Sequence, residues 1–321
     1  MIETMSKEEM QSYQGVREVP DDFYQYWQQL ILSLQLPELK VVEKDFHIKQ
    51  IRFFDLYFNG TNGSQVYAKM LLPNTNQKTP VIFHFHGYQG CSSDWSEYFK
   101  FVMCGYGVIA LDVRGQAGKS QDNGQFDGLT VKGHIVRGMI AGRERLFYQD
   151  IFLDVYTLIE QVRKLPEIDD ENMQTFGASQ GGALAVVGAA LHPRIKQVVT
   201  IYPFLADFPR ILELGQITEP YDELFRYFKF QDPFYRTKEQ IFKALDYIDI
   251  KNFAHMIKGK VKLLTGIRDD ICPPSTQYAF FNRVQTNKEH ILLPEYGHEA
   301  LNVGVNDLCF NWLINTEIEG V

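Results

Sequence analysis

The stretch TFGASQGGA, residues 175 to 183, places a serine between glycines where an apolar strand is predicted to run into a helix. The order is strand, then Gly177-x-Ser179-x-Gly181, then a helix rich in alanine and glycine, which is typical of a nucleophile elbow. In such a turn the serine takes a strained backbone conformation and presents its hydroxyl above the sheet. Glycine and serine are common, so the pattern alone also fits an ordinary turn, and its surroundings must decide between the two interpretations.

Short, nearly continuous apolar runs recur on both sides of this turn. Such runs suit strands that are covered on both faces, as in a parallel sheet. Because they alternate with helical patterns, the sequence predicts an open α/β sheet. The runs are TPVIFHFHG, YGVIALDVRG, KQVVTIYPF, VKLLTGIRDD and HILLPEYGH, which begin at residues 79, 106, 196, 261 and 290.

We find no linker or internal repeat in the 321 residues and expect a single domain, 1–321, with two additions. Residues 1–45 are expected to form an N-terminal helical extension, because 20–34 carries a helix start signal and then apolar residues at helical spacing. Residues 205–258 are expected to form a helical cap, since a long crossover with its own helices often covers an active site. Residues 47–73 alternate polar and apolar residues around NGTNG, which predicts an antiparallel hairpin at a sheet edge.

Composition argues against several classes of protein. The formal net charge of -8 disfavours nucleic-acid and anionic-membrane surfaces, because phosphate binding needs concentrated Lys and Arg. The four cysteines lie far apart without a CxxC pair, so neither a zinc site nor a disulfide framework is indicated. The polar, acidic N-terminus does not fit a signal peptide, and no 18-residue apolar run follows, so we expect a cytoplasmic protein.

A serine hydroxyl is a poor nucleophile until a base takes its proton and an acid orients that base. The chain supplies Ser179, Asp269 and His298 in the order found in α/β-hydrolases, which is the fold that we predict. Asp269 and His298 each follow a predicted strand, and strand C-termini gather at one edge of an open sheet. The neighbouring Asp270 is interpreted as a surface or capping residue.

Eight histidines compete for the role of base, and the position of His298 is unlike that of the others. It lies beyond the last predicted strand, between a glycine and a final helix; a structural role is the alternative. His84 and His86 form an HxH pair that could hold a metal. Because no cysteine or acidic cluster lies near them in the sequence, we expect them to pack or hydrogen-bond within the sheet.

Acyl transfer also needs N–H donors for the oxyanion. One is expected from Gln180, the residue after the serine, and one from Tyr88 in HFHGYQG, where an early strand ends. The alternative for this second segment is a glycine-rich turn with no part in catalysis.

Five motifs occur together, in order and at suitable spacing. They are HGYQG at 86–90, DVRGQ at 112–116, GASQGG at 177–182, Asp-x-x-x-Pro-Pro at 269–274 and YGHE at 296–299. Together they resemble the acetyl xylan esterase and cephalosporin-C deacetylase family, carbohydrate esterase family seven, over nearly the whole chain. The chain departs from the family pattern in two places that bear on the preferred alcohol: Ala117-Gly118 after the RGQ motif, and a short QGCSSDW segment that ends at Trp95.

The resemblance implies a serine esterase that removes acetyl groups from small oxygen esters, such as acetylated xylo-oligosaccharides and cephalosporins, without metal or cofactor. It also implies an intracellular, ring-like homohexamer. Residue by residue, it implies that Ser179 is the nucleophile, His298 the base and Asp269 the acid, with Tyr88 and Gln180 as oxyanion donors. It further implies that the RGQ motif supports the nucleophile region; its residues here are Arg114, Gly115 and Gln116.

Two other functions fit the same fold. A carboxylesterase for larger acyl groups or a peptidase would use the same three residues, although a peptidase usually has a separate substrate-selecting domain and the chain has no such segment. A non-catalytic binding module would be favoured by loss of a triad residue, and none is lost here. Activity on acetyl esters and on aminoacyl amides, and labelling of Ser179 by a fluorophosphonate, separate these possibilities.

Overall fold

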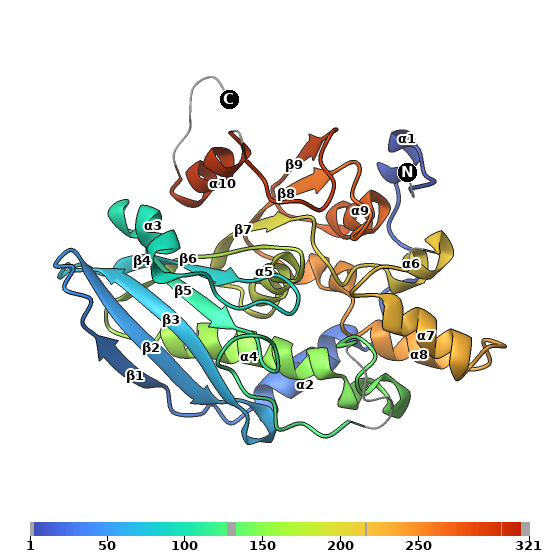
Figure 1. The fold of residues 1–321 in the computed structure, drawn as a ribbon, viewed down its shortest axis with the longest axis horizontal. Coiled ribbons are helices and arrows are strands. Elements are labelled where there is room, and N and C mark those ends of the chain that lie inside the picture. Colours follow the sequence, from blue (N-terminus) through green and yellow to red (C-terminus); the bar gives the residue numbers. More distant parts are fainter. Residues whose placement is uncertain (1–2, 127–132, 216, 303, 316–321) are drawn as a thin grey trace.

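The computed structural model describes residues 3–126, 133–215, 217–302 and 304–315. Its strands are β1 (Lys40–Lys44), β2 (Ile51–Asn59), β3 (Gln65–Pro73), β4 (Thr79–Phe85), β5 (Gly107–Asp112), β6 (Ile168–Ala178), β7 (Ile195–Ile201), β8 (Lys260–Gly266) and β9 (Lys288–Leu293). They form one nine-stranded sheet in the order β1-β2-β3-β5-β4-β6-β7-β8-β9 (Figure 1). From β5 through β4 to β9 all neighbours are parallel, which confirms the predicted open α/β sheet.

Helices cover both faces of the sheet, so its central strands are buried. The α-helices are α1 (Lys7–Met10), α2 (Phe23–Ser33), α3 (Phe99–Met103), α4 (Phe147–Val162), α5 (Gln180–Leu191), α6 (Phe208–Leu214), α7 (Asp222–Phe230), α8 (Lys238–Leu245), α9 (Pro274–Arg283) and α10 (Val305–Leu313). Short 3-10 helices are η1 (Thr61–Gly63), η2 (Trp95–Tyr98), η3 (Met139–Ala141), η4 (Arg143–Arg145), η5 (Ile250–Asn252) and η6 (Ala254–Met256). One apolar core packs α2, α4 and α5 against the sheet, and a second core packs α3 and α10 against the opposite face.

Helix α5 lies at the centre of the larger core, and all twelve of its residues are buried. It is apolar on every side, which is the pattern of a helix enclosed by protein. Its small side chains let it approach β6 and the neighbouring strands closely. The N-terminus of α5 is thereby fixed directly above the end of β6.

The N-terminal part of the sheet differs from the prediction. Strands β2 and β3 form the predicted antiparallel hairpin, but β1 pairs outside β2, so the hairpin is not the edge. Strand β1 lies within 1–45, for which the sequence predicts only helix. Its five residues, KVVEK, are all exposed and lack alternation of buried and exposed positions, which is the signal a half-buried strand would give.

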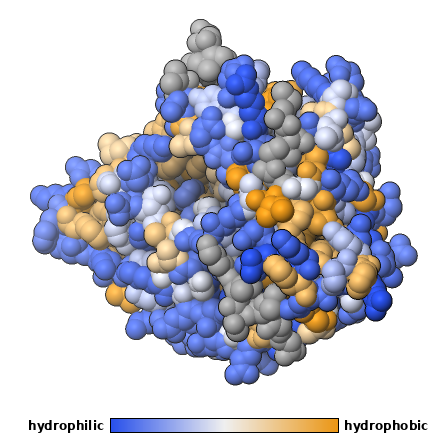
Figure 2. All heavy atoms as spheres, turned by 45° about the vertical axis from the view of Figure 1, so that its right-hand side comes forward, coloured by the Kyte–Doolittle hydropathy of each residue, from blue (hydrophilic) through white to orange (hydrophobic). Residues whose placement is uncertain are grey.

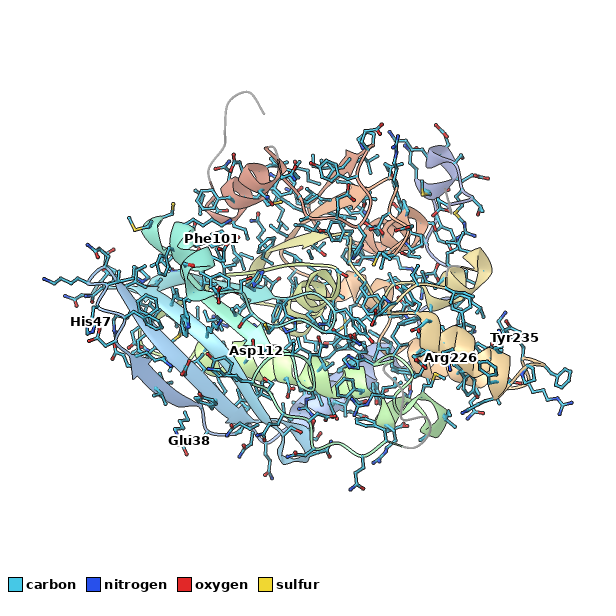
Figure 3. The ribbon with its side chains drawn as sticks, viewed as in Figure 1. Glu38, His47, Phe101, Asp112, Arg226 and Tyr235 are labelled. Carbon is cyan, nitrogen blue, oxygen red and sulfur yellow. The ribbon has the colours of Figure 1, made fainter. Side chains whose placement is uncertain are left out.

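Between β7 and β8 the chain forms α6, α7, α8, η5 and η6. This segment, the β7–β8 insertion, lies at the right of Figure 1, beyond the C-terminal ends of the parallel strands. Its outer end carries Arg226 and Tyr235, which project away from the sheet (Figure 3). Exposed hydrophobic atoms are scattered among hydrophilic ones on the face that Figure 2 presents. No helix among the described residues combines the length and apolar character needed to cross a membrane.

Candidate active site

Ser179 lies in the sharp turn between β6 and α5, with φ 57° and ψ −121°. This backbone conformation is costly for a residue with a side chain, so the surrounding structure must hold it. Its N–H donates to Ile201 O on β7 at 2.9 Å. A Cβ on Gly177 would overlap the backbone of Gly181, and a Cβ on Gly181 would overlap the carbonyl of Phe85. Both glycines are therefore needed for this close approach.

The structure brings Ser179, His298 and Asp269 into one hydrogen-bonded series. His298 Nε2 lies 2.9 Å from Ser179 Oγ, and His298 Nδ1 lies 2.9 Å from Asp269 Oδ2. The Asp269 side chain is fully buried, and the His298 side chain is 16% exposed. With Asp269 as a carboxylate, which can only accept, the ring proton lies on Nδ1 and Nε2 accepts from the serine hydroxyl.

Asp269 is held by the loop that follows β8. Its second oxygen, Oδ1, accepts the backbone N–H groups of Ile271 at 2.9 Å and Cys272 at 2.7 Å. These bonds fix the carboxylate so that Oδ2 faces the histidine. Asp270 is exposed and takes no part in these contacts, as the sequence predicts.

His298 is held by the loop that follows β9. The Tyr202 ring packs against the imidazole with 4.5 Å between ring centroids, and its hydroxyl donates to Glu299 O at 3.0 Å. The Gly297 N–H donates to Glu299 Oε2 at 2.6 Å, which closes the turn around the histidine. Neither loop belongs to a regular element, yet each is tied down by bonds to neighbouring segments.

Tyr88 lines the same cleft as Ser179, and Gln180 directly follows the serine in the chain. Gln180 is the first residue of α5, where backbone N–H groups have no partner within the helix. Tyr88 lies in a turn closed by Gly90 N–H donating to Gly87 O at 3.1 Å. Burial raises the pKa of the Tyr88 phenol, whose oxygen accepts the His134 N–H at 3.2 Å. The turn is thus tied to the protein through the tyrosine side chain.

The amide of Gln180 also connects this turn to the segment after β5. Gln116 Nε2 donates to Gln180 Oε1 at 2.7 Å, and Gln180 Nε2 donates back to Gln116 Oε1 at 3.0 Å. Tyr148 on α4 donates to the same Gln180 oxygen at 2.9 Å. Gln180 Nε2 also lies 3.4 Å from Gly87 O. Nothing in the spacing of two glutamines 64 residues apart predicts this reciprocal pair.

The other two residues of the RGQ segment are structural supports. Arg114 is fully buried, and its guanidinium donates two 2.6 Å hydrogen bonds to Asp154 on α4. Gly115 has φ +66°, and a Cβ there would lie 3.1 Å from Asp122 Cβ. The segment therefore leaves β5 through a glycine turn that is anchored to α4 by a buried ion pair.

The HxH pair, His84 and His86, packs and hydrogen-bonds within the protein, as the sequence predicts. His86 Nε2 accepts the Val113 N–H at 2.9 Å, and His86 Nδ1 lies 2.8 Å from Gly87 O. Burial lowers the pKa of His84 to about 4, and its Nδ1 lies 3.3 Å from the Tyr98 hydroxyl. Within the described ranges, no group of three or more His, Cys, Asp or Glu side chains is arranged to hold a metal ion.

A cleft of about 690 Å³ opens above the serine. Its lining joins the turn after β4, the elbow, the histidine loop and the β7–β8 insertion. A volume of this size suits a small molecule, and convergent polar groups in such a cleft are typical of an active site. The lining includes His84, Tyr88, Cys91, Ser179, Tyr202, Glu219, Pro220, Ile271, His298 and Glu299.

Comparison with known proteins assigns the family. The model of the family described as acetyl xylan esterase (AXE1) matches residues 1–316. The chain belongs to the acetyl xylan esterase family. The resemblance seen in the sequence motifs is thereby confirmed.

Solved structures agree with the acetyl xylan esterase assignment. Acetyl Xylan Esterase 1 from Thermoanaerobacterium sp. JW/SL YS485 is 38% identical, with a TM-score of 0.93 over 97% of this chain and 98% of that one. The α/β-hydrolase GrgF from Penicillium sp. sh18 shares the fold alone, at 16% identity and a TM-score of 0.57 over 82% of this chain and 96% of that one. The predicted α/β-hydrolase fold is therefore confirmed.

One curated relative is a longer protein than this chain. Acetyl esterase Axe7A from Xylanibacter ruminicola is 27% identical over 289 residues, which are 87% of this chain. The match covers 63% of the relative's own length.

One residue that contacts the serine, Cys272, could not be predicted from the sequence. Cys272, three residues beyond Asp269, is fully buried. Burial raises the pKa of its thiol well above the usual range, while a hydrogen bond with the Ser179 side chain opposes the shift. Because a thiol reacts as the thiolate, Cys272 is held in its unreactive form beside the serine.

Proposed function

We propose that the protein is a serine esterase that removes acetyl groups from small oxygen esters through an acetyl-enzyme intermediate. The observation that carries the proposal is the series of 2.9 Å contacts from Asp269 through His298 to Ser179, in a chain of the acetyl xylan esterase family. Candidate substrates are acetylated xylo-oligosaccharides and acetoxymethyl cephalosporins, as the resemblance implies.

In the proposed first half-reaction, His298 Nε2 takes the Ser179 proton while Oγ attacks the acetyl carbonyl carbon. Asp269 keeps the ring proton on Nδ1 and stabilises the imidazolium that forms. The oxygen of the tetrahedral intermediate takes the negative charge, and we assign the Tyr88 and Gln180 N–H groups as its donors. Losing one such donor typically costs about 3 kcal/mol of transition-state stabilisation. The imidazolium then protonates the departing alkoxide, and the alcohol leaves.

In the second half-reaction, His298 takes a proton from a water molecule as that water attacks the acetyl-enzyme. The same two N–H groups again hold the oxyanion. Collapse of the intermediate returns the proton to Ser179 and releases acetate. Apart from the ester and the water molecule, each proposed step uses only Ser179, His298, Asp269 and the two assigned N–H donors.

Other parts of the chain have supporting roles in this proposal. Residues 1–321 act as one domain in which residues 205–258 form a cap, and its Glu219 and Pro220 line the cleft. Residues 1–45 form an extension, and Arg114, Gly115 and Gln116 position the turns on either side of the serine. The reciprocal amide pair between Gln116 and Gln180 supports this assignment.

We also propose, from the resemblance, that the protein assembles as a homo-oligomer, a hexamer in the form that the family suggests. Native mass measurement tests this, and a monomeric mass would contradict it. The bulky, half-buried Tyr88 beside the proposed oxyanion position favours short acyl groups. Equal rates on acetate, butyrate and octanoate esters would contradict that preference.

Pre-steady-state hydrolysis of p-nitrophenyl acetate tests the proposed function. We expect a burst of p-nitrophenol that matches the enzyme concentration, because acylation should precede slower deacylation. Ser179→Ala should lower kcat by roughly 10⁶-fold while the variant stays folded by circular dichroism. Full turnover by Ser179→Ala, or cleavage of aminoacyl amides in preference to acetyl esters, would contradict the proposal.

A further inference from the structure

The side chain of Gln277 lies directly beside Asp269, the proposed acid. Gln277 comes from α9, the helix that follows the Asp269 loop, and its side chain is fully buried. Its Nε2 donates to Cys272 O at 2.6 Å and to Asp269 Oδ2 at 3.4 Å. Oδ2 is the same oxygen that accepts from His298 Nδ1. One amide group therefore contacts both the carboxylate that faces the base and the loop that carries this carboxylate.

The orientation of the Gln277 amide follows from its partners. Cys272 O and the Asp269 carboxylate can only accept, so the amide nitrogen must face them. The amide oxygen faces the opposite way, and the Thr265 hydroxyl donates to it at 2.7 Å. A hydroxyl has a single proton, so in the second contact of Thr265, with His290 Nε2 at 2.8 Å, the ring nitrogen donates. The direction of each hydrogen bond from His290 through Thr265 and Gln277 to Asp269 is thereby determined.

Regular elements hold this series of hydrogen bonds in place. Thr265 is fully buried on β8, the strand before the proposed acid, and His290 is half-buried on β9, the strand before the proposed base. The His290 ring packs against two rings of α9, with 4.7 Å between centroids to Tyr278 and 4.5 Å to Phe281. Buried polar groups that have their partners make a structure more rigid. The amide of α9 is therefore fixed from both neighbouring strands.

The series ends on the carboxylate oxygen that the proposed mechanism needs to be oriented. Asp269 Oδ1 is held by the N–H groups of Ile271 and Cys272. The Gln277 amide adds a donor to Oδ2, beside the His298 ring. A carboxylate that is held at both oxygens keeps its direction while the imidazole gains and loses a proton. A donor at this oxygen also stabilises the charged form of the acid.

We propose that Gln277 is a positioning residue for the esterase reaction, and that Thr265 and His290 hold its amide in the direction that this role requires. The inference rests on the proposed function, because it needs Asp269 to act on His298. Neither Gln277 nor Thr265 is among the described residues that line the cleft. The series therefore acts through Asp269 and not by contact with the substrate.

Steady-state hydrolysis of p-nitrophenyl acetate by Gln277→Met tests this role. Methionine is similar in length to glutamine but cannot donate to the carboxylate. Rates are expressed per Ser179 labelled to completion by a fluorophosphonate, so that misfolded molecules do not contribute. We expect kcat to fall about tenfold, the size typical for loss of a hydrogen bond to a charged group. KM should stay within about twofold, because the contacts between enzyme and substrate are unchanged.

A pair of substitutions at Thr265 separates positioning from packing. Thr265→Val keeps the shape of the side chain but removes the hydroxyl that orients the Gln277 amide, and should lower kcat about fivefold. Thr265→Ser keeps the hydroxyl and loses a methyl group, and should retain kcat within about twofold. Thr175→Val is the matched control, because Thr175 is a fully buried threonine on β6 whose hydroxyl donates to Ala185 O at 2.9 Å. It loses one buried hydrogen bond without affecting the acid, and should also retain kcat.

The outcomes separate this inference from the proposed function. If the wild type hydrolyses p-nitrophenyl acetate but Gln277→Met or Thr265→Val keeps the kcat of Thr175→Val, the inference is overturned and the esterase function stands. Equal losses of kcat in Thr265→Ser and Thr265→Val would also overturn it, because packing and not the hydroxyl would then be responsible. If the wild type shows no hydrolysis of the acetyl ester, the proposed function fails and the inference fails with it.

Discussion

Asp269 and Asp270 are adjacent in the chain but lie in different environments. Asp269 is buried, accepts two backbone N–H groups and contacts His298, whereas Asp270 is exposed. Only the first can orient the imidazole and stabilise its charged form. At the scale of single residues, this contrast separates the proposed acid from a neighbour of identical chemistry.

Asp269→Asn should lower kcat by about 10⁴-fold, because an amide can donate to Nδ1 and so favours the wrong tautomer of His298. Asp270→Asn, the matched control, should retain kcat within about twofold, since surface substitutions usually have small effects. Steady-state kinetics with p-nitrophenyl acetate measures both. Equal losses in the two variants would mean that the acid has been wrongly assigned.

Single residues also mark the limit of what the sequence could predict. The positions of Ser179, Asp269 and His298 could be inferred from their order and from the strands that each follows. Cys272 beside the serine and the pairing of Gln116 with Gln180 could not, because both depend on where loops meet in space. A motif indicates that a residue is needed, but contacts between distant loops leave no periodic signal.

At the scale of elements, the turn from β6 into α5 determines where the serine lies. Gly181 contacts the backbone of β4, and a Cβ there would overlap Phe85 O. Gly188 lies later in the same helix, where a Cβ would meet only side-chain ends, Ile159 Cδ1 at 3.0 Å and Val155 Cγ1 at 3.2 Å. Backbone atoms of a central strand cannot move aside as side-chain ends can.

Gly181→Ala should therefore destabilise the protein by about 3 kcal/mol or more, in line with the cost of forcing an atom into a packed core. Gly188→Ala should change the free energy of unfolding by no more than about 1 kcal/mol, because helix propensity gained offsets the tight contact. Urea denaturation followed by circular dichroism measures both values. A Gly181→Ala variant as stable as Gly188→Ala would show that the elbow does not require this close approach.

The elements that the sequence predicted well are the buried ones. Continuous apolar runs marked β4 to β9, and helical spacing marked the helices of the β7–β8 insertion. Strand β1 was missed because its exposed residues are held by backbone pairing with β2, which imposes little on side-chain identity. The outer edge of the sheet was therefore assigned to the wrong strand.

At the scale of the whole molecule, the half-buried His290 couples stability to pH. Burial, with smaller effects from Lys288 and Lys7, lowers the pKa of His290 from 6.5 to about 4. The unfolded chain therefore takes up this proton first as the pH falls. Stability contributed by the neutral ring is present above pH 6.5 and is lost between about 6.5 and 4.

His290→Gln removes this titration and should make unfolding free energy less dependent on pH in that window, by up to about 1.4 kcal/mol per pH unit. His47→Gln is the control, because the His47 side chain is 88% exposed and lies at the edge of the molecule (Figure 3). Urea denaturation at several pH values provides the measurement. The same pH dependence in His290→Gln and the wild type would contradict the assigned protonation.

The proposed function of the whole molecule requires that the acetyl group of the substrate is transferred to Ser179 Oγ before water releases it. Mixing the enzyme with p-nitrophenyl acetate, quenching in acid within the burst and mapping peptides by mass spectrometry tests this directly. We predict that the peptide containing Ser179 gains the mass of one acetyl group, and that Ser179→Ala shows no such gain. Turnover without an acetylated peptide, or with the acetyl group on another residue, would contradict the proposed mechanism.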